Sequence, residues 1–479
     1  MQSKLRFAPS PTGNLHIGSV RTAIFNWVWA KKLKAKLVLR IEDTDLERSK
    51  KEFEDNINEG LSWLGIHFDE GPGQALSGQK YRQSERIKAN VYQPYLDKLI
   101  NTGHAYYCFE SDEELAAERA EAEKKGVPYI YSRRSLMYTP EEVAQKRAAN
   151  MPYTIRFKVP NSKQITLNDE IRGNIEFDSN LFSDFIIVKS DGYPTYNFAV
   201  VVDDYEMGIT HVVRGEDHIS NTPKQIMIYN ALEWEAPRFA HLPIILGEDR
   251  SKLSKRHGAK SVSEYKDAGF LPHALINYLS LLGWSPPEGK ELLAIDELME
   301  LFEINRINKA GAVFDTVKLT WMNKQYLSKL DDEAFLSWVK PFLSKSNQEL
   351  DALDLKILSV RDNVEVLSRI NHYLEVFTLT TTAFFERFKQ LAVNETDQLV
   401  IHHARKYLLD LSEWSNETVS DLIQHLMTEL SLGKGKVMKP LRKSFTGYES
   451  GPNLVDCLAL IPKSEILKRL DLVISYVST

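Results

Sequence analysis

The fold is decided by residues 5–18, which read LRFAPSPTGNLHIG. The apolar run at residues 5–8 predicts a short buried strand, and the prolines, glycine and asparagine at residues 9–14 predict a tight turn. Apolar side chains then recur on one face of a helix, at Val20, Ala23, Ile24, Trp27 and Val28. A strand that runs through a turn into a helix is the start of a βα unit, so this stretch predicts an α/β fold.

The rest of the first half repeats this alternation. Further strands are predicted at residues 37–41, 185–188, 211–213 and 242–246, with a helix at residues 223–232. Strands that are separated by helices form parallel sheets. We therefore expect a doubly wound, Rossmann-like parallel sheet, with ligands bound beyond the carboxyl ends of its strands.

Two regions depart from this pattern. Residues 88–184 combine a charged helical segment at 111–125 with strand-like segments at 153–159 and 165–177, which predicts an inserted α+β domain. Strand signals fade from about residue 320, and helical periodicity at 354–377 and 455–477 predicts an all-α C-terminal region. The expected divisions are a split Rossmann-like domain at 1–87 and 185–246, the insert at 88–184, a third domain at 247–326, and a helical region at 327–479 with an internal boundary near residue 380.

Composition excludes several classes of protein. The 479 residues are 43% apolar and 26% charged, which excludes a disordered chain, a collagen-like chain and a coiled-coil rod. The formal net charge of −6 argues against a general polyanion binder, although a local basic face can still bind nucleic acid. The only cysteines are Cys108 and Cys457, which excludes a disulfide framework and a four-thiolate zinc site.

The sequence shows neither a membrane-spanning segment nor a secretory signal. No apolar run approaches the roughly 18–20 residues that are needed to cross a membrane. The first ten residues, MQSKLRFAPS, lack the apolar segment of a secretory signal. We therefore expect a cytoplasmic protein without a membrane partner.

Two candidate chemical features follow the first two predicted strands. At His16-Ile-Gly18 a helix begins, where a glycine lets a flat ring or a phosphate approach the backbone and the helix N-terminus favours an anion. The alternative is a capped helix with a surface histidine. At Arg40-Ile-Glu-Asp-Thr-Asp45 three carboxylates could bind a metal, an ammonium group or sugar hydroxyls, or they could form a solvated acidic loop.

Two more features follow the later strands. Tyr193-Pro-Thr-Tyr196-Asn197 is followed by Arg214-Gly-Glu-Asp217-His218, in which Arg214 can present a forked donor to a carboxylate or phosphate. The alternative is a structural ion pair of Arg214 with Asp203 or Asp204. Lys252-Leu-Ser-Lys-Arg256 has three cations and a hydroxyl, which suit a polyphosphate, unless it is only an exposed basic loop.

Taken together, these features resemble the class I aminoacyl-tRNA synthetases, and more narrowly the bacterial-type glutamyl branch. The two class signatures are matched by His16-Ile-Gly-Ser19 and Lys252-Leu-Ser-Lys255-Arg256. Phrases typical of the glutamyl branch occur at residues 8–13, 40–45, 81–86, 190–196, 269–275, 313–315 and 321–323. The likeness is strong to about residue 326 and looser beyond it, where it rests on the helical pattern and on residues 440–447.

The resemblance implies a two-step reaction. ATP, used with Mg²⁺, and glutamate form glutamyl-adenylate and pyrophosphate, and the glutamyl group then passes to the terminal adenosine of tRNA-Glu. His16, Lys252 and Lys255 take the catalytic positions. The implied glutamate contacts are Arg6, Ala8, Ser10, Glu42, Tyr196 and Arg214. The implied ATP contacts are His16, Gly18, Asp217, His218, Lys252, Leu253, Ser254, Lys255 and Arg256, and those to the tRNA 3′ end are Asp43, Thr44 and Asp45.

The chemistry of glutamate agrees with these assignments. Its side-chain carboxylate needs a buried cation, for which Arg6 and Arg214 are available, and Glu42 can hold its ammonium group. Glutamine would leave the arginines uncompensated, so such a site can discriminate without editing. The sequence departs from relatives that carry zinc in the insert, because the matching stretch Tyr106-Tyr-Cys108-Phe-Glu110 has one thiol. We therefore expect no zinc and no resident metal site.

The C-terminal helical region is expected to read the anticodon. Its basic cluster comprises Lys434, Lys436, Lys439, Arg442 and Lys443, which could contact phosphates or form a solvated lysine-rich loop. Whether the protein charges tRNA-Glu alone or also tRNA-Gln stays open, and residues 368–373 are candidates for that choice. The family implies a monomer. The rival interpretations are a glutaminyl-tRNA synthetase and a catalytically silent tRNA-binding paralogue, and the intact signature residues argue against the latter.

Overall fold

The computed structural model describes residues 2–45, 47–74, 78–127, 129–254 and 260–478. These residues form two compact units, each with its own hydrophobic core. Unit 1 extends to residue 264 and includes residues 275–316, whereas unit 2 comprises residues 265–274 and 317–479.

The main sheet of unit 1 has six strands in the order β2-β1-β8-β9-β5-β6. The pairs β1–β2, β1–β8 and β8–β9 are parallel, as the βα alternation predicted. The carboxyl ends of these four strands therefore meet at one edge of the sheet. The strand bounds are β1 (Lys4–Phe7), β2 (Lys36–Leu39), β5 (Gln164–Asp169), β6 (Gly173–Asp178), β8 (His211–Gly215) and β9 (Arg238–Leu242).

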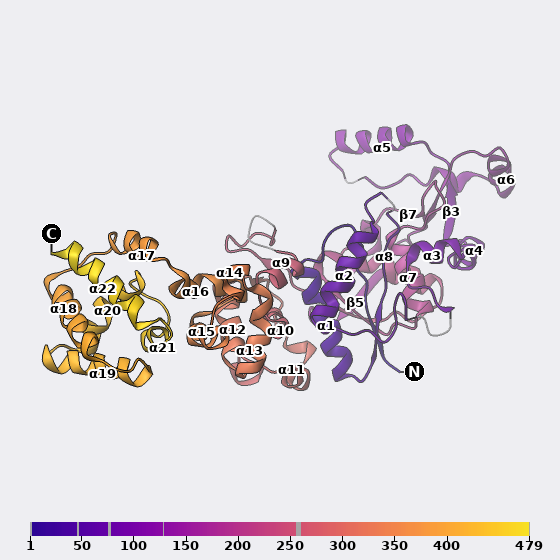
Figure 1. The fold of residues 1–479 in the computed structure, drawn as a ribbon. Helices are drawn as coiled ribbons and strands as arrows, with labels where there is room; N and C mark the ends of the chain where they lie inside the picture. Colours follow the sequence, from indigo (N-terminus) through magenta and orange to yellow (C-terminus); the bar gives the residue numbers. More distant parts are fainter. Residues whose placement is uncertain (1, 46, 75–77, 128, 255–259, 479) are drawn as a thin grey trace. The chain divides into compact units, whose positions relative to one another are not determined.

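Helix α1 (Ile17–Lys32), labelled in Figure 1, joins β1 to β2. It contacts β1, β2 and β8. It begins one residue after His16, where the sequence predicted a helix start, and most of its side chains are buried. The other helices of unit 1 are α2 (Lys51–Trp63), α3 (Gln83–Lys88), α4 (Gln93–Asn101), α5 (Asp112–Lys124), α6 (Pro140–Ala148), α7 (Tyr196–Glu206), α8 (Thr222–Ala231) and α11 (Ile295–Leu301). The chain passes between the units in α9 (Val262–Asp267), α10 (Pro272–Leu281) and α12 (Thr316–Ser328).

Two predicted strands belong to a different sheet from the one expected. Residues 185–188 form β7 (Phe185–Val188), which pairs antiparallel with β4 (Thr154–Phe157) in the three-stranded sheet β3-β4-β7, where β3 is Ala105–Cys108. The expectation that they extend the parallel sheet is wrong. Conversely, the β5–β6 hairpin, expected within the insert, joins the main sheet because Asp169 pairs with Phe239 of β9. An apolar run identifies a buried strand but does not specify its partner.

The strand predicted at residues 242–246 is interrupted. Strand β9 ends at Leu242, and a separate short strand, β10 (Ile245–Leu246), pairs with β11 (Ala312–Val313). Pro243 lies between them and has no N–H with which to continue a ladder. The helix predicted at residues 111–125 is observed as α5, and a capping box between Ser111 and Glu114 fixes its first turn.

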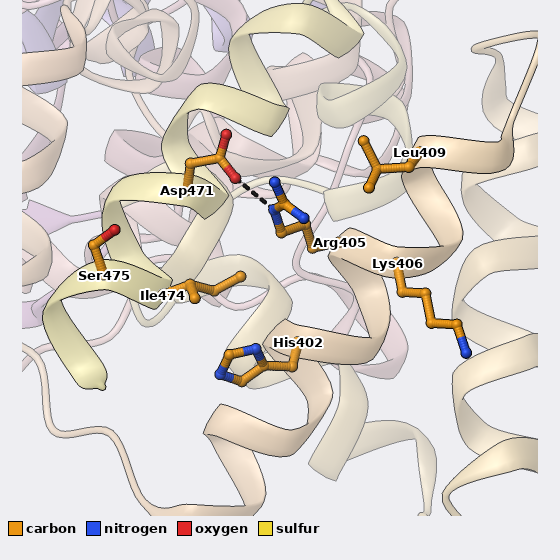
Figure 2. A pocket seen from close by; sticks show the side chains of 7 residues that line it. All are labelled: His402, Arg405, Lys406, Leu409, Asp471, Ile474 and Ser475. Carbon is orange, nitrogen blue, oxygen red and sulfur yellow. Dashed lines mark hydrogen bonds and ion pairs between the residues drawn. The ribbon is translucent and has the colours of Figure 1, made fainter. Parts of the chain in front are cut away.

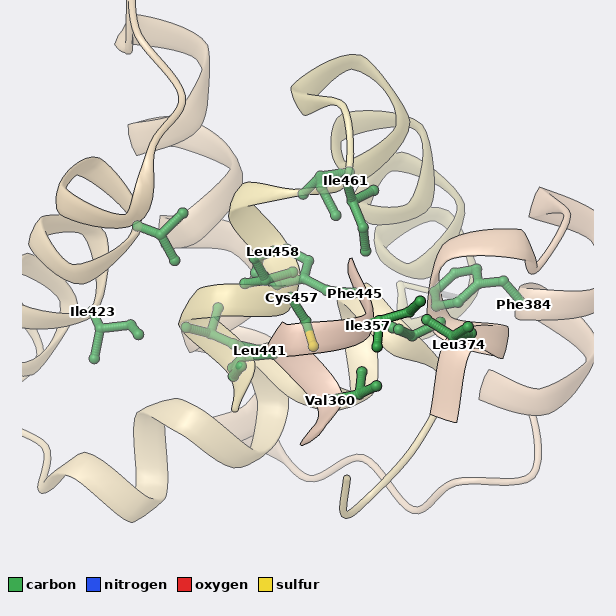
Figure 3. Close-up of a cluster of buried hydrophobic side chains, with 14 of the residues drawn as sticks. Ile357, Val360, Leu374, Phe384, Ile423, Leu441, Phe445, Cys457, Leu458 and Ile461 are labelled. Carbon is green, nitrogen blue, oxygen red and sulfur yellow. The ribbon is translucent and has the colours of Figure 1, made fainter. Parts of the chain in front are cut away.

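Within the described residues, unit 2 is helical, as predicted. Its core is continuous, and Figure 3 shows Leu441 and Leu458 near the buried Cys457, with Phe384 on the other side of the same cluster. Burial raises the pKa of the Cys457 thiol to about 11, so the thiol is protonated at neutral pH. The helices are α13 (Asp332–Val339), α14 (Lys345–Gln348), α15 (Leu353–Val360), α16 (Ile370–Thr378), α17 (Thr381–Phe388), α18 (Glu395–Asp410), α19 (Asn416–Glu429), α20 (Lys434–Thr446), α21 (Leu454–Ala459) and α22 (Lys463–Val477).

Membrane insertion has no support in these elements. Among the described residues, every helix is too short or too polar to cross a bilayer.

Candidate active site

A buried ion network lies at the carboxyl edge of the main sheet. Asp204 of α7 accepts from Arg6 Nε of β1 at 3.2 Å and from Arg40 Nη1 at 2.5 Å. Arg40, which directly follows β2, also donates to Glu42 at 2.9 Å. Burial raises the pKa of Asp204, but the charges of Arg40 and Arg6 outweigh it and the net pKa is lowered. Asp204 is therefore ionised and joins β1 to the end of β2.

The neighbouring carboxylate, Asp203, completes this network. It accepts from Arg86 Nε at 2.6 Å, from the Tyr92 hydroxyl at 2.9 Å and from Gln83 Nε2 at 2.8 Å. Buried charges are tolerated when they are paired and hydrogen-bonded. Each charged residue of this cluster has a partner of opposite charge, although Arg40 Nε and Arg86 Nη2 make no hydrogen bond among the described residues. Sequence reasoning considered Asp203 and Asp204 only as partners of Arg214, and that interpretation is wrong because they pair with other arginines.

Arg214 has a different environment. Its guanidinium donates to His241 Nε2 at 3.1 Å, to the Tyr196 hydroxyl at 3.3 Å, and through Nη2 to Thr222 and Gln225 at 2.8 Å each. The residue is only 5% exposed, and burial lowers its pKa. Among the described residues no carboxylate lies within ion-pair distance of it. Arg214 is thus a buried cation that no carboxylate of the described residues neutralises by direct contact.

Tyr196 and His218 extend this polar group. The Tyr196 hydroxyl lies 2.9 Å from His218 Nδ1. Because that hydroxyl already accepts from Arg214, its own proton is available to Nδ1. Burial, and then the charge of Arg214, lower the pKa of His218 to about 4. His218 is therefore neutral at pH 7 and, with Nδ1 accepting from Tyr196, carries its ring proton on Nε2.

Glu42 is the third polar group facing the same region. Its backbone N–H donates to Pro9 O at 3.1 Å, which places the Ala8 to Ser10 segment beside it. Burial raises the pKa of Glu42, and the charges of Arg40 and Arg6 oppose that effect. The structure therefore brings together the predicted glutamate contacts Arg6, Glu42, Tyr196 and Arg214, with Ala8 and Ser10 at the turn after β1.

His16 lies at the N-terminus of α1 and caps it. Its Nδ1 accepts from Ser19 N at 3.3 Å, as in the capped-helix alternative. A side chain at Gly18 would meet the His16 ring at 3.1 Å, so glycine lets the ring fold back over the first turn. Desolvation by surrounding atoms, and then the Lys252 charge, lower the pKa of His16. His16 Nε2 lies 3.1 Å from the Ser19 hydroxyl, so both ring nitrogens contact Ser19, and a phosphate at this helix N-terminus would take the place of that hydroxyl.

The predicted basic loop begins next to His16. The backbone of Lys252 forms an antiparallel β-bridge with Leu246 of β10. Lys252 Nζ lies 3.9 Å from Asp217 Oδ2, and the side chains of Lys252 and Asp217 are both more than half exposed. Leu253 donates its backbone N–H to Ile245, and Ser254 follows it. Lys255 and Arg256 lie outside the described residues. The predicted ATP contacts His16, Asp217 and Lys252 are therefore close to one another.

The acidic loop after Arg40 is partly engaged within the fold. Asp43 accepts from the Ser84 backbone N–H at 2.8 Å and from its hydroxyl at 2.5 Å, which ties the loop to α3. Asp45 pairs with the exposed Arg48. Thr44 lies between them and is partly exposed.

The single thiol of the insert is surrounded by hydrogen-bonding partners. Cys108 Sγ lies 2.9 Å from Glu110 Oε2 and accepts from Arg156 Nε at 3.2 Å. Glu110 also accepts from Tyr131 and Ser135 at 2.8 Å each. A guanidinium in contact with the only thiol does not fit a zinc site, which needs a set of convergent electron-pair donors.

A pocket of about 400 Å³ lies elsewhere, on unit 2 between α18 and α22 (Figure 2). The predicted catalytic residues do not line it. In this pocket Arg405 of α18 forms an ion pair with Asp471 of α22, so the arginine charge is already neutralised. Its lining residues are His402, Arg405, Lys406, Leu409, Asp471, Ile474 and Ser475.

The parallel sheet, the histidine at the start of α1 and the basic loop beside it define the class of protein. Residues 2–321 match the family described as tRNA synthetases class I (E and Q), catalytic domain, and residues 334–474 match an anticodon binding domain. The chain belongs to the class I tRNA synthetases of this E and Q family.

Within the family, the chain is similar to glutamate–tRNA ligases. It is 45% identical over 472 residues to that of Aquifex aeolicus, which covers 98% of each chain. It is 45% identical over 478 residues to that of a Sulfurihydrogenibium species, with 99% of each chain covered. The crystal structure of a glutamate tRNA ligase from Elizabethkingia meningosepticum, in complex with its amino acid, superimposes with a TM-score of 0.87, 35% identity and 99% coverage of both chains.

Proposed function

We propose that this chain is a glutamate–tRNA ligase that joins glutamate to the 3′-terminal adenosine of tRNA-Glu at the expense of ATP. The observation that carries the proposal is the environment of Arg214. It is a buried guanidinium with neutral partners and no carboxylate among the described residues, next to a second arginine, Arg6, that a carboxylate already neutralises. A negatively charged amino-acid side chain supplies the missing charge, whereas glutamine does not.

Glutamate fits the surrounding groups. Its side-chain carboxylate contacts Arg214 and the Tyr196 hydroxyl, with Arg6 beside them, and its ammonium group contacts Glu42. Ala8 and Ser10 lie at the turn next to Glu42 and contact the amino-acid backbone. Each charged group of glutamate then meets a group of opposite charge, which favours binding of the free amino acid in one orientation.

The first step is an attack by the glutamate α-carboxylate oxygen on the α-phosphorus of ATP, from which pyrophosphate leaves. Mg²⁺ enters with ATP as part of the substrate. His16 and the first turn of α1 meet the phosphates, and Gly18 lets the nucleotide approach closely. Lys252, Lys255 and Arg256 stabilise the charge that develops on pyrophosphate, with Leu253 and Ser254 in the same loop. Asp217 and His218 contact the adenosine.

The second step transfers the glutamyl group. A ribose hydroxyl of the terminal adenosine attacks the carbonyl carbon of glutamyl-adenylate, and AMP leaves. Asp43, Thr44 and Asp45 contact the tRNA 3′ end. The insert at 88–184 binds the acceptor stem, residues 247–326 contact the stem below it, and residues 327–479 bind the anticodon.

The basic cluster of the C-terminal region divides into two parts. Arg442 donates to Pro452 O, and Lys443 pairs with Asp397, so both are engaged within unit 2. Lys434, Lys436 and Lys439 are exposed on α20 and remain for tRNA phosphates. We further propose that the enzyme acts as a cytoplasmic monomer and holds no zinc.

The test is transfer of radiolabelled glutamate to purified tRNA-Glu and tRNA-Gln, measured side by side with ATP and Mg²⁺. Charging of tRNA-Glu alone supports a discriminating ligase. Charging of both tRNAs supports a non-discriminating one, with residues 368–373 the first to exchange. Charging of neither by the folded protein contradicts the proposal and favours a silent paralogue.

A further inference from the structure

Arg214 is linked to a buried carboxylate through an imidazole. Arg214 Nε donates to His241 Nε2 at 3.1 Å, and His241 Nδ1 lies 2.6 Å from Asp169 Oδ2. The side chains of His241 and Asp169 are fully buried. The three residues belong to β8, β9 and β5, which are adjacent strands of the main sheet. The link therefore crosses the sheet on a rigid scaffold.

The partners of His241 determine its tautomer. An arginine can only donate, so His241 Nε2 presents a lone pair to Arg214 Nε, and the Thr222 hydroxyl lies 3.1 Å from the same nitrogen. The ring proton then lies on Nδ1, where the Asp169 carboxylate accepts it. Burial lowers the pKa of His241, which agrees with a neutral ring. Burial raises the pKa of Asp169, but hydrogen bonds from His241 and from the Arg172 backbone outweigh it and lower the net pKa.

We propose that Asp169 and His241 are positioning residues that hold Arg214 in the orientation and charge state in which it binds glutamate. The inference rests on the proposed function, which assigns glutamate to Arg214. A carboxylate in direct contact would neutralise Arg214, as Asp204 neutralises Arg6. A neutral imidazole instead fixes the guanidinium and leaves its positive charge for the substrate.

The remaining contacts of the guanidinium follow the same principle. Nη2 donates both protons to neutral oxygens, those of Thr222 and Gln225. Gln225 is itself oriented by a hydrogen bond from its Nε2 to Asn197 at 3.1 Å. The Nε proton goes to His241, and one of the two Nη1 protons goes to the Tyr196 hydroxyl. The second Nη1 proton is the one that remains for a ligand, so a ligand would approach Arg214 from the Tyr196 side.

The substitution Asp169→Asn should reverse the tautomer of His241. Asp169 Oδ1 accepts from the backbone N–H groups of Ile171 at 3.0 Å and Arg172 at 2.8 Å. The backbone N–H of His241 donates to the same carboxylate, 3.1 Å from Oδ2 and 3.3 Å from Oδ1. An asparagine oxygen at the Oδ1 position keeps all three backbone donors within reach, so its NH₂ group faces His241 Nδ1. The ring must then accept at Nδ1 and carry its proton on Nε2, opposite the donating Arg214 Nε. Two donors cannot bond, so Arg214 moves.

Kinetics of tRNA charging test this sequence of events. We expect Asp169→Asn to raise KM for glutamate by about 10- to 100-fold, the equivalent of one hydrogen bond to a charged group, and to leave KM for ATP unchanged. Glu170→Gln is the matched control, since it removes a neighbouring carboxylate that pairs with Arg238. An Asp169→Asn enzyme whose KM for glutamate equals that of Glu170→Gln overturns the proposal.

Nitrogen NMR of the whole chain, labelled with ¹⁵N-histidine, reports the tautomer directly and requires no activity. The His241 signals are those missing from His241→Gln. We expect Nδ1–H in the wild-type chain and Nε2–H in Asp169→Asn. A wild-type Nε2–H tautomer overturns the proposal even if Asp169→Asn does not fold. If the tautomer is as expected but the wild-type chain does not charge tRNA with glutamate, the proposed function fails and the geometry of the link stands.

A conservative variant separates positioning from simple packing. The amide of His241→Gln can turn its oxygen to Arg214 whatever residue occupies position 169. Asp169→Asn raises KM for glutamate, and the double variant Asp169→Asn with His241→Gln should therefore lower it most of the way back to the wild-type value. Failure of this rescue in a folded double variant would mean that the carboxylate acts through packing and not through the acceptor on His241.

Discussion

Arg40 Nη1 lies 2.5 Å from Asp204 Oδ1, and neither side chain is more than 4% exposed. Asp204 also holds Arg6, so a single carboxylate of α7 balances cations from two parallel strands. Because α7 also begins with Tyr196, this contact fixes the helix that presents a predicted glutamate contact. The ion network and the proposed glutamate site therefore share helix α7.

Removal of that carboxylate should destabilise unit 1. Asp204→Asn leaves Arg6 and Arg40 buried with too little negative charge, and breaking such a network costs about 3–5 kcal/mol. We expect the urea unfolding midpoint of unit 1 to fall accordingly. Asp191→Asn is the control, because Asp191 is half exposed and pairs with Lys189 on the surface. Equal stability of the two variants would contradict the role given to Asp204.

Arg214 should determine glutamate affinity. Arg214→Gln removes the uncompensated charge, and loss of a buried charge pair with the substrate costs about 2–5 kcal/mol, or roughly 30- to 5,000-fold in kcat/KM for glutamate. Steady-state charging of tRNA-Glu at varied concentrations of glutamate and ATP measures kcat/KM for glutamate. Arg238→Gln, on the neighbouring strand, removes an exposed arginine and should leave kcat/KM near the wild-type value.

The acid sensitivity of unit 1 should depend partly on His218. Its folded pKa is about 4, whereas an unfolded histidine titrates near 6.5. Between these values the unfolded chain binds a proton that the folded chain does not, so stability falls as pH falls, by about 1.4 kcal/mol per pH unit at most. His218→Asn keeps an acceptor for Tyr196 and should reduce this slope between pH 6.5 and 5. Urea unfolding at several pH values measures the slope, with the exposed His104→Asn as control, and an unchanged slope in His218→Asn would refute the assignment.

Metal content is predicted from the surroundings of Cys108. The thiol faces a guanidinium and a carboxylate that already has three donors, so a zinc ion would lack ligands and meet a positive charge. We expect elemental analysis to find substoichiometric zinc, and EDTA to leave the thermal midpoint unchanged. One zinc per chain, lost together with stability on chelation, would disprove this.

Sequence reasoning predicted that the candidate site residues lie close together, but not which of them form ion pairs. The rule that parallel strands end at one edge was enough to place Arg6, Glu42 and Arg214 together. Which carboxylate pairs with which arginine depends on how α7 packs on the strands, and no local pattern encodes that. Asp204 therefore pairs with Arg6 and Arg40, although Arg214 was the partner considered.

Asp169 and His241 were missed for a related reason. Asp169 was assigned to the insert, whereas its hairpin joins the main sheet and brings the carboxylate to His241. A long-range strand pairing of this kind has no signal in a single sequence. Residues 269–275 match a phrase of the family, but the sequence does not show why a glycine stands at position 269. The packing of unit 2 gives the reason.

The contacts of Gly269 show this reason and support a last prediction. Its φ is +82°, and an added Cβ would lie 2.6 Å from Leu367 Cβ and 2.7 Å from the Leu367 backbone nitrogen. Leu367 N also donates to Gly269 O at 3.1 Å, and Ser368 Oγ donates to Ala268 O at 2.8 Å. The two segments are therefore in backbone contact, and Leu367 belongs to the core of unit 2.

Gly269→Ala should separate these segments and destabilise unit 2. The matched control is Gly192→Ala, because Gly192 has the same φ of +82° but open space around its Cβ position. Gly192 lies in unit 1, so the control is measured as the change in the free energy of unfolding of that unit. It gives the cost of a left-handed alanine alone, about 1 kcal/mol. We expect the first variant to lose a further 1–3 kcal/mol or so through the clash, measured as a lower urea midpoint of unit 2. If both variants lost only the backbone cost, the contact between residues 269 and 367 would have to be looser than it is here.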